Sequence, residues 1–196
     1  NPYLTKKKLL LSNKKNYKRK NIILSVGRLT KQKNFVDLIS AFKIFQKKYP
    51  SYELHIIGDG NEKNKLKNLV KNYKLEDKIF LEGWKKNIHN DYKKAKLFVL
   101  PSLYEGLGNV LIDAINYSLP CVATNCKSGP NEILDHGKGG YIVPIDNSKA
   151  LAKKMIFALD KTNISNKKIK YSQKRQFRFN SEKQCNKYLN YLDNIL

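Results

Sequence analysis

The chain has 196 residues, of which 41% are hydrophobic, and 39 lysine and arginine residues against 16 acidic ones give it a formal net charge of +23. This length and composition suit a buried core in one domain or at most two, and they exclude a disordered chain. The longest apolar runs, such as those at residues 22–26 and 97–100, are far shorter than the ~18 residues of a membrane-spanning helix. We therefore expect no transmembrane helix.

Six short apolar runs alternate with longer segments of helical period. Strands are predicted at residues 22–26, 53–57, 79–81, 97–100, 121–123 and 141–143. Apolar strands joined by helical crossovers are typical of a parallel sheet that is covered on both faces. The sequence therefore predicts a doubly wound α/β domain.

Helical periodicity fills most of the segments between these strands. The clearest helix ends before Pro50, a second apolar stripe spans residues 66–73, and Ser148 is expected to cap the helix after the last strand. Residues 162–180 are polar and break the alternation of strands and helices. A final helix is expected to begin at Ser181, and it needs something to pack against. Its apolar face would carry Cys185, Tyr188, Leu189 and Leu192.

Glycines closely follow four of the predicted strands, at Gly27, Gly58, Gly83 and Gly106. The carboxyl ends of parallel strands share one edge of the sheet, where ligands bind, and glycine lets a ligand approach the backbone. We therefore expect the functional site at this edge. Each glycine taken alone also fits a tight turn between a strand and a helix.

Residues 105–113 join a predicted strand end to an apolar helix through a loop with two glycines. The unpaired N–H groups and partial positive charge of a helix N-terminus predict that residues 106–109 hold a phosphate. Glu105 stands just before the turn, and Asp113 is expected about two turns along the helix, roughly 9–12 Å away at ~1.5 Å per residue. One extended ligand with phosphates between hydroxyl-bearing groups would fit, and a sugar nucleotide has that layout.

Two cationic residues are expected at this edge of the sheet. Arg28 directly follows the first predicted strand, and Lys33 comes near the start of the next helix. An arginine fork and a lysine point charge together suit a pyrophosphate. The sequence has no Asp-x-Asp pair and no cluster of histidines and carboxylates. We therefore expect no metal and no cofactor, and assign charge stabilisation to these fixed cations.

Much of the positive charge lies in two flanks. Residues 1–20 hold eight cations, residues 161–178 hold seven, and neither segment contains an acid. Such flanks fit a solvated surface, an anionic membrane surface or nucleic acid. Only four of the 39 cations are arginine, which indicates a lysine-rich composition as much as polyanion binding. We expect no nucleic-acid partner.

The three cysteines are Cys121, Cys126 and Cys185, an odd number without CxxC spacing. This pattern argues against a disulfide framework and against a zinc site, and it predicts packed or surface thiols in a reducing compartment. The first residues do not resemble a secretory signal. We therefore expect a cytoplasmic location.

Six short motifs in order carry a resemblance to a known family. Together they resemble the C-terminal half of a GT-B glycosyltransferase of family 4 (group 1), over about residues 20–160. Any one of them could arise by chance, whereas the six in order are specific. They are Gly27-Arg28-Leu29 with Gln32-Lys33, Ile56-Ile57-Gly58-Asp59-Gly60, Pro101-Ser102-Leu103-Tyr104-Glu105-Gly106, the spacing from Glu105 to the acid at 113, Pro120-Cys121-Val122-Ala123-Thr124, and Ser128-Gly129-Pro130-Asn131-Glu132-Ile133.

The resemblance implies that residues 21–160 form a Rossmann-like domain that binds the nucleotide sugar of a retaining transferase. Residues 1–20 would be a linker and basic flank. Residues 161–196 would be a basic segment and a C-terminal helix that packs toward an N-terminal Rossmann domain missing from this chain. The isolated domain is then expected to bind its donor without transferring the sugar.

The resemblance also implies roles for single residues. Three would be catalytic, with Glu105 on the donor hexose and Arg28 and Lys33 on the diphosphate. Asp113 would bind the ribose, although the family usually has glutamate there and aspartate is one methylene shorter, about 1.5 Å. The other donor-binding residues would be Gly106, Leu107, Gly108 and Asn109 at the distal phosphate, Gly83 and Trp84 beside the base, and Gly27 and Gly58.

The expected donor is a UDP-linked hexose or N-acetylhexosamine, because the Ser-Gly-Pro element after Cys126 is similar to transferases that build surface polysaccharides and lipid-linked oligosaccharides. The expected acceptor is a glycan or a lipid-linked sugar at the inner face of the cytoplasmic membrane, where basic flanks would meet anionic lipid. Three alternatives stay open: a GT-B-related epimerase or phosphorylase, a degenerate transferase kept as a scaffold, and a nonenzymatic polyanion-binding module.

Overall fold

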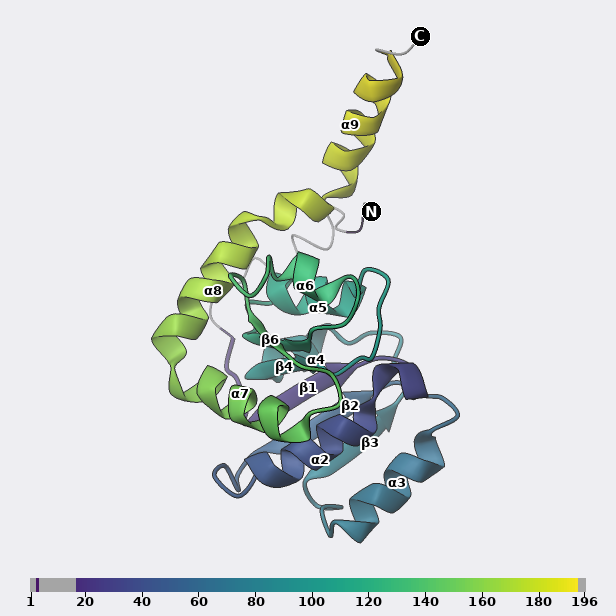
Figure 1. Ribbon diagram of the computed structural model, residues 1–196, viewed down its shortest axis with the longest axis vertical. Coiled ribbons are helices and arrows are strands. Elements are labelled where there is room, and N and C mark those ends of the chain that lie inside the picture. The colour runs from purple at the N-terminus through teal and green to yellow at the C-terminus, as the bar shows by residue number, and fades with distance from the viewer. Residues whose placement is uncertain (1–2, 4–16, 194–196) are drawn as a thin grey trace.

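The computed structural model describes residue 3 and residues 17–193. The described residues form one six-stranded sheet in which neighbouring strands pair in parallel (Figure 1). The strand order is β3-β2-β1-β4-β5-β6, so the direction of winding reverses between β1 and β4. The predicted doubly wound, Rossmann-like α/β fold is therefore confirmed. The strands are β1 (Ile22–Val26), β2 (Glu53–Ile57), β3 (Ile79–Gly83), β4 (Leu97–Leu100), β5 (Cys121–Thr124) and β6 (Tyr141–Val143).

Four of these strands have the predicted bounds, and two are longer than predicted. β3 continues to Gly83, whose carbonyl accepts a hydrogen bond from the Gly58 N–H at 2.8 Å. β5 continues to Thr124, which lies opposite Val143 of β6. Backbone pairing thus extends the ladder past the last apolar residue that the sequence pattern could use.

Helices cover both faces of the sheet, and each face has its own apolar cluster. α2 (Phe35–Phe45), α3 (Lys63–Asn72) and α7 (Ser148–Asp160) pack on one face. α4 (His89–Lys94), α5 (Asn109–Asn116) and α6 (Pro130–Ile133) pack on the other (Figure 1). Each strand end therefore passes through a short loop into a helix, and these loops carry the predicted site residues.

The start of α7 corrects one prediction. The side chain of Asn147 accepts a hydrogen bond from the Ala150 N–H at 2.9 Å, so Asn147 is the N-cap and Ser148 is the first helical residue. Asparagine and serine both suit this position, because either side chain can satisfy an unpaired N–H of the first turn. The prediction that Ser148 caps the helix is wrong by one residue.

A helix occupies part of the polar segment that breaks the alternation of predicted strands and helices. α8 spans Thr162–Lys174, and a 3-10 turn, η2, follows at Gln176–Phe179. The buried side chains of α8 are Ser165 and Ser172, which donate hydrogen bonds to the carbonyls of Ala158 and Gly139 at 2.6 and 2.7 Å. Hydroxyls rather than an apolar stripe hold this helix in place, so a search for apolar periodicity misses it.

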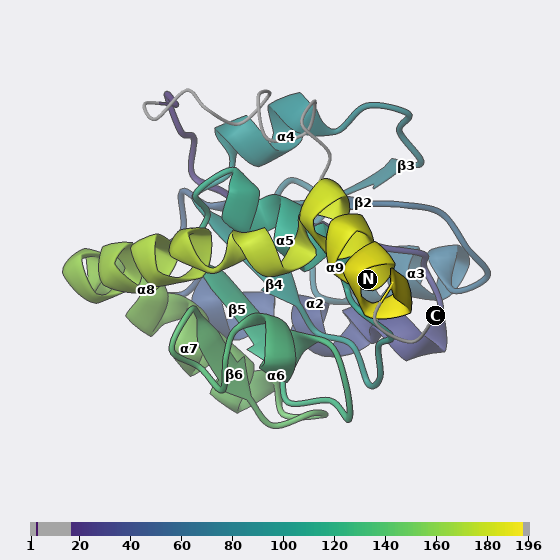
Figure 2. The same ribbon diagram turned by 90° about the horizontal axis from the view of Figure 1, so that it is seen from above.

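α8 packs against α5 and α7, and the view from above shows it crossing the sheet beside α5 (Figure 2). Gln173 donates a hydrogen bond to Ser118, just after α5, and Lys168 donates one to the carbonyl of Gly137, just before β6. Both positions lie where the strands begin. α8 therefore lies along the amino edge of the sheet, opposite the edge at which the predicted site residues gather.

The predicted final helix is present as α9 (Ser181–Asp193). It projects from the body of the domain (Figure 1), and its expected apolar face is exposed, with Tyr188 64% and Leu189 55% accessible. The expectation that this face packs on an N-terminal domain stays a prediction.

Most of the predicted N-terminal flank, residues 1–2 and 4–16, lies outside the described residues, whereas Arg19 has a defined structural role. Its guanidinium donates hydrogen bonds to the carbonyls of Ala95 and Tyr117, both at 2.7 Å, and to that of Ser118 at 3.1 Å. Ala95 and Tyr117 end α4 and α5, where unpaired carbonyls carry a partial negative charge. This cation ties two helix ends together and is half-buried, so it does not belong to a solvated basic surface.

None of the helices within residues 17–193 has the length and apolarity that a bilayer crossing demands. Cys121 and Cys126 are buried, Cys185 is exposed, and all three are free thiols.

Candidate functional site

The loops after β1 and β4 meet at the carboxyl edge of the sheet, on either side of the point where the strand order reverses. The N–H of Leu103 donates to the carbonyl of Gln32 at 2.8 Å, and the Gln32 amide donates to the carbonyl of Tyr104 at 2.9 Å. In open α/β sheets this reversal point forms the ligand crevice. Arg28 and Glu105, which follow β1 and β4, are therefore carried by loops that are bonded to each other.

Glu105 and Lys33 form an ion pair inside this rim. The Lys33 ammonium lies 2.5 Å from Oε1 of Glu105, and only 13% and 6% of the two side chains are exposed. The hydroxyl of Ser102 donates to the same oxygen at 2.7 Å. The structure thus brings together two of the three residues predicted to be catalytic, whereas the Arg28 side chain lies exposed on the neighbouring loop.

The predicted phosphate cradle begins α5. Gly108 takes a left-handed conformation with φ 77° and caps the helix, and the first turn contains no acidic residue that would compete for an anion. The first N–H groups of a helix lack partners within it and carry a partial positive charge. Residues 106–109 therefore offer an anion-binding helix start on the same loop as Glu105.

The rim glycines fall into two kinds. A Cβ atom on Gly58 would lie 1.9 Å from the carbonyl oxygen of Gly27, so the approach of the two loops explains why glycine is needed there. Above Gly83 and Gly106, by contrast, a Cβ would meet nothing within 4 Å. Only the second pair offers open space to a ligand. Trp84, next to Gly83, is 73% exposed.

Asp113 lies in α5 and accepts a hydrogen bond from the Tyr3 hydroxyl at 2.6 Å. Burial and the Asp113 carboxylate raise the pKa of the Tyr3 phenol far above its ordinary value. The Tyr3 N–H donates to the carbonyl of Phe179 at 2.9 Å, so Tyr3 is held beside α5 and η2. Sequence reasoning did not identify Tyr3, because no local pattern links two residues 110 positions apart.

Three hydroxyl residues around Glu105 were also not assigned a role from the sequence. Ser102, Thr124 and Ser128 lie within the motifs that carry the family resemblance, and each makes a hydrogen bond to Glu105 or to its loop. Their presence in those motifs was the available signal. Burial, together with the Glu105 charge, raises the pKa of the Cys126 thiol.

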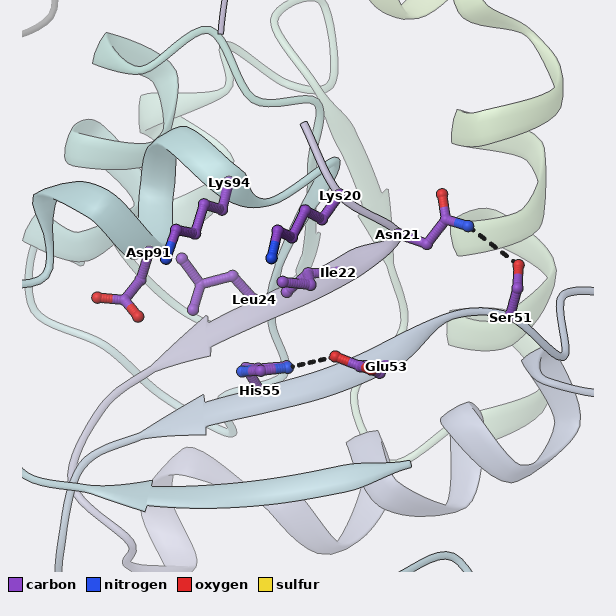
Figure 3. Close-up of a pocket in the computed structure, with 9 residues that line it drawn as sticks. All are labelled: Lys20, Asn21, Ile22, Leu24, Ser51, Glu53, His55, Asp91 and Lys94. Atoms are coloured by element: carbon purple, nitrogen blue, oxygen red, sulfur yellow. Dashed lines mark hydrogen bonds and ion pairs between the residues drawn. The ribbon is translucent and has the colours of Figure 1, made fainter. Parts of the chain in front are cut away.

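A cavity of about 280 Å³ lies away from this rim, between α4 and the first halves of β1 and β2 (Figure 3). His55 lies on its floor, with Nε2 2.9 Å from Glu53, while Nδ1 is 2.6 Å from Glu82. None of the predicted site residues lines this cavity. Among the residues that the structure describes, no three His, Cys, Asp or Glu side chains are arranged to hold a metal ion.

Comparison with known proteins identifies the family of this chain. Residues 7–175 match the family described as glycosyl transferases group 1. The amylovoran biosynthesis glycosyltransferase AmsD of Erwinia amylovora is 39% identical over 132 residues, which are 67% of this chain and 36% of AmsD. The N-acetylgalactosamine-N,N'-diacetylbacillosaminyl-diphospho-undecaprenol 4-alpha-N-acetylgalactosaminyltransferase of Campylobacter jejuni is 36% identical over 129 residues, 66% of this chain and 34% of that protein. The chain thus spans about a third of these relatives.

Solved structures show the same fold. A crystal structure of a Staphylococcus aureus TarM mutant in complex with Fondaparinux, alpha-GlcNAc-glycerol and UDP matches with a TM-score of 0.82 at 25% identity, covering 90% of this chain and 36% of that one. The pneumococcal O-GlcNAc transferase GtfA, solved with UDP and GlcNAc, matches with a TM-score of 0.81 at 22% identity, covering 94% of this chain and 38% of that one. The family match covers most of the sequence, and the fold is shared. The chain therefore belongs to the group 1 glycosyltransferases.

Proposed function

We propose that this chain is the donor-binding half of a retaining glycosyltransferase that takes a hexose or N-acetylhexosamine from a UDP sugar. The observation that carries the proposal is the grouping of Lys33, Glu105 and the start of α5 at the reversal point of the sheet. A diphosphate needs cations and free N–H groups, and a sugar needs a fixed hydrogen-bond acceptor. One rim supplies all of these.

Each part of the donor has a place in this proposal. Arg28 and Lys33 bind the diphosphate, residues 106–109 bind the phosphate nearer the sugar, and Glu105 binds the hexose. Asp113 binds the ribose once Tyr3 releases it. The base lies at Gly83 and Trp84, where open space and an exposed indole support stacking. Gly27 and Gly58 allow the loops after β1 and β2 to approach each other closely, and this approach shapes the donor site.

Transfer breaks the bond between the sugar C1 and the diphosphate oxygen and forms a bond from C1 to an acceptor hydroxyl oxygen, whose proton passes to the departing UDP. The negative charge that develops on UDP has to be stabilised. Lys33 and the N–H groups of α5 are held in position, and Arg28 adds a second cation from the same rim, so together they would provide this stabilisation without a metal ion. Lys33 is paired with Glu105, and it would be shared between this carboxylate and the diphosphate. We further propose that the isolated chain binds donor but transfers little, because the acceptor side belongs to a second domain.

The proposed acceptor is a glycan or a lipid-linked sugar of a surface polysaccharide or oligosaccharide pathway. The Campylobacter relative is named for a diphospho-undecaprenol substrate, and a Staphylococcus aureus relative, 29% identical over 142 residues, for poly(ribitol-phosphate). AmsD is named for amylovoran biosynthesis. These names support an acceptor carried on a lipid or polymer. We place this acceptor at the inner face of the cytoplasmic membrane.

A basic surface supports peripheral contact with that membrane. Residues 148–179 contain ten cations and one acid, Asp160, which pairs with Lys48 at 2.6 Å. Lys167, Lys170 and Lys174 are exposed and share one face of α8. Because α8 lies along the amino edge, this surface would orient the domain on anionic lipid and leave the donor rim open.

Calorimetry with UDP and UDP sugars tests the proposed function. Arg28→Ala should weaken UDP binding by at least about tenfold, because a charged hydrogen-bond donor to the diphosphate is lost. Arg175→Ala, which removes an arginine from the opposite part of the domain, is the matched control and should leave UDP affinity unchanged. Equal UDP affinity in Arg28→Ala and the unaltered chain would refute the assignment. Isomerised or phosphorolysed sugar from UDP sugar alone would instead identify an epimerase or a phosphorylase.

A further inference from the structure

Two donors from different loops fix one oxygen of the Glu105 carboxylate. Ser102 Oγ donates to Oε1 at 2.7 Å, and Lys33 Nζ donates to the same atom at 2.5 Å. Nothing in the part of the chain that the structure describes donates to the second oxygen, Oε2. A carboxylate held through one oxygen presents the other in a defined direction. Oε2 is therefore the free acceptor of the site.

Ser102 is itself fixed from the neighbouring strand. The Thr124 hydroxyl, at the end of β5, donates to the Ser102 carbonyl at 2.5 Å. Both residues are fully buried, with 0% of their surface exposed. The hydroxyl of Ser128 also donates to the backbone carbonyl of Glu105. Hydrogen bonds from the loops after β4 and β5 thus restrain both the side chain and the backbone of Glu105.

Burying these hydroxyls and this carboxylate costs free energy unless each has a hydrogen-bond partner. Alanine or valine would fill the same space without needing a partner. The two donors on Oε1 also differ in whether a bound diphosphate would compete for them. In the proposed reaction a diphosphate draws on the Lys33 charge, whereas the Ser102 hydroxyl is fully buried and donates to Oε1 away from solvent. Ser102 can therefore keep Oε1 in place while Lys33 is shared.

We propose that Ser102 and Thr124 are positioning residues, which hold Glu105 so that its Oε2 accepts a hydrogen bond from a hydroxyl of the donor sugar. This inference rests on the proposed function and deepens it, because it names the residues that set the orientation of the sugar-binding carboxylate. Ser102 acts on the side chain directly, and Thr124 acts by fixing the backbone from which the Ser102 hydroxyl projects.

The test compares affinity for UDP with affinity for UDP-glucose and UDP-N-acetylglucosamine by calorimetry. In the unaltered chain, the sugar nucleotide that fits should bind more tightly than UDP. Ser102→Ala should reduce that preference about tenfold and leave UDP affinity unchanged, since one charge-assisted hydrogen bond is lost. Thr124→Val should reduce the preference in the same direction, and Thr124→Ser, which keeps the hydroxyl, should retain it.

Ser25→Ala is the matched control, because Ser25 is also fully buried but donates to the Val99 carbonyl at 2.6 Å, away from Glu105. It should leave the preference unchanged. A merely structural role for Ser102 predicts equal losses for UDP and UDP sugars in Ser102→Ala, and that result would overturn the inference. If the unaltered chain bound UDP but showed no preference for any UDP sugar, the sugar role of Glu105, and this inference with it, would be refuted.

A double-mutant cycle tests the contact without any ligand. Ser102→Ala and Glu105→Ala, alone and combined, should show coupling of about tenfold in the unfolding constant, measured in urea. The Ser25→Ala and Glu105→Ala cycle should show none. Zero coupling between Ser102 and Glu105 would overturn the inference even if UDP binds, whereas strong coupling in a chain that binds no UDP would locate the failure in the proposed function.

Discussion

Lys33 and Glu105 neutralise each other across two loops that follow different strands of the sheet, with 2.5 Å between Nζ and Oε1. Because both side chains are largely withdrawn from water, this pair differs from the exposed lysine pairs on α3, such as that between Lys65 and Glu62. An exposed pair contributes little to stability, and removing either partner changes little. Removing one partner of a buried pair leaves the other charge without compensation.

Lys33→Ala should therefore lower the free energy of unfolding by about 3 kcal/mol, measured by urea titration. The double variant Lys33→Met with Glu105→Met should recover much of this loss, because no unpaired charge remains. Lys65→Ala serves as the control for an exposed pair and should stay within about 0.5 kcal/mol of the unaltered chain. A double variant less stable than both single ones would contradict this account.

Arg19→Ala should destabilise the domain by about 2 kcal/mol, because it leaves the carbonyls at the ends of α4 and α5 without their charged donor. Arg19→Lys should recover only part of the loss, since one ammonium cannot reproduce the fork. Arg28→Ala is the matched control: its side chain is exposed, and its removal should cost less than about 0.5 kcal/mol. Equal stability of the two alanine variants would disprove the role of Arg19.

Ionisation of the Tyr117 phenol makes the free energy of unfolding depend on pH in the alkaline range. Burial, with the nearby Tyr17 and Asp113, raises the pKa of Tyr117 from 10.0 to about 12. The folded chain keeps this proton after the unfolded chain has lost it, so the contribution is complete below pH 10 and is lost as pH rises from 10 toward 12. Unfolding in urea across this range should show a shallower decline for Tyr117→Phe. An identical slope for both proteins would rule out the assignment.

Asp113→Ala should weaken UDP binding by about tenfold and leave pyrophosphate binding unchanged, because only UDP carries the ribose. Tyr3→Phe should strengthen UDP binding a few-fold, since it removes the hydroxyl that donates to Asp113. Isothermal calorimetry with both ligands separates the two effects. Parallel losses for UDP and pyrophosphate in Asp113→Ala would mean that this residue acts through the fold of α5.

Reversing the charge of the α8 lysines should weaken binding to anionic lipid. Replacing Lys167, Lys170 and Lys174 by glutamate should reduce sedimentation with phosphatidylglycerol vesicles about 100-fold, at roughly 1 kcal/mol for each lysine near the surface. The same replacement at Lys47, Lys67 and Lys71 alters the net charge equally on another surface and should have little effect. Equal losses in both variants would indicate that net charge, and not this face, governs binding.

β1, β4 and β5 were predictable because burial on both faces of the sheet gives each a short apolar run bounded by turn residues. The positions of Arg28 and Glu105 followed from this, since a strand end fixes the edge at which the next residue lies. α8 was not predictable in this way, because its composition is polar and the residues that it buries are Ser165 and Ser172. Hydrogen bonds to carbonyls of other segments replace the apolar stripe.

For the site, contacts between residues that are distant in the sequence could not be predicted. The order of the motifs indicated which residues gather at the rim, but no spacing showed that Lys33 and Ser102 share one oxygen of Glu105. The hydrogen bond between Tyr3 and Asp113 was equally hidden. The shift of the α7 cap from Ser148 to Asn147 had a local cause: two adjacent residues were both suitable, and only the backbone geometry decided between them.

The absence of a side chain at Gly58 has a consequence for how this scaffold can diversify. A Cβ on Gly58 would collide with the loop of Arg28, and one on Gly129 would lie 2.7 Å from the carbonyl oxygen of Gly106. Close backbone contacts at Gly58 and Gly129 thus leave the main chain around the rim little room to change its conformation. New specificity has to arise by exchanging the groups that project from this rigid frame, of which Trp84 and Tyr104 are the most accessible aromatic ones.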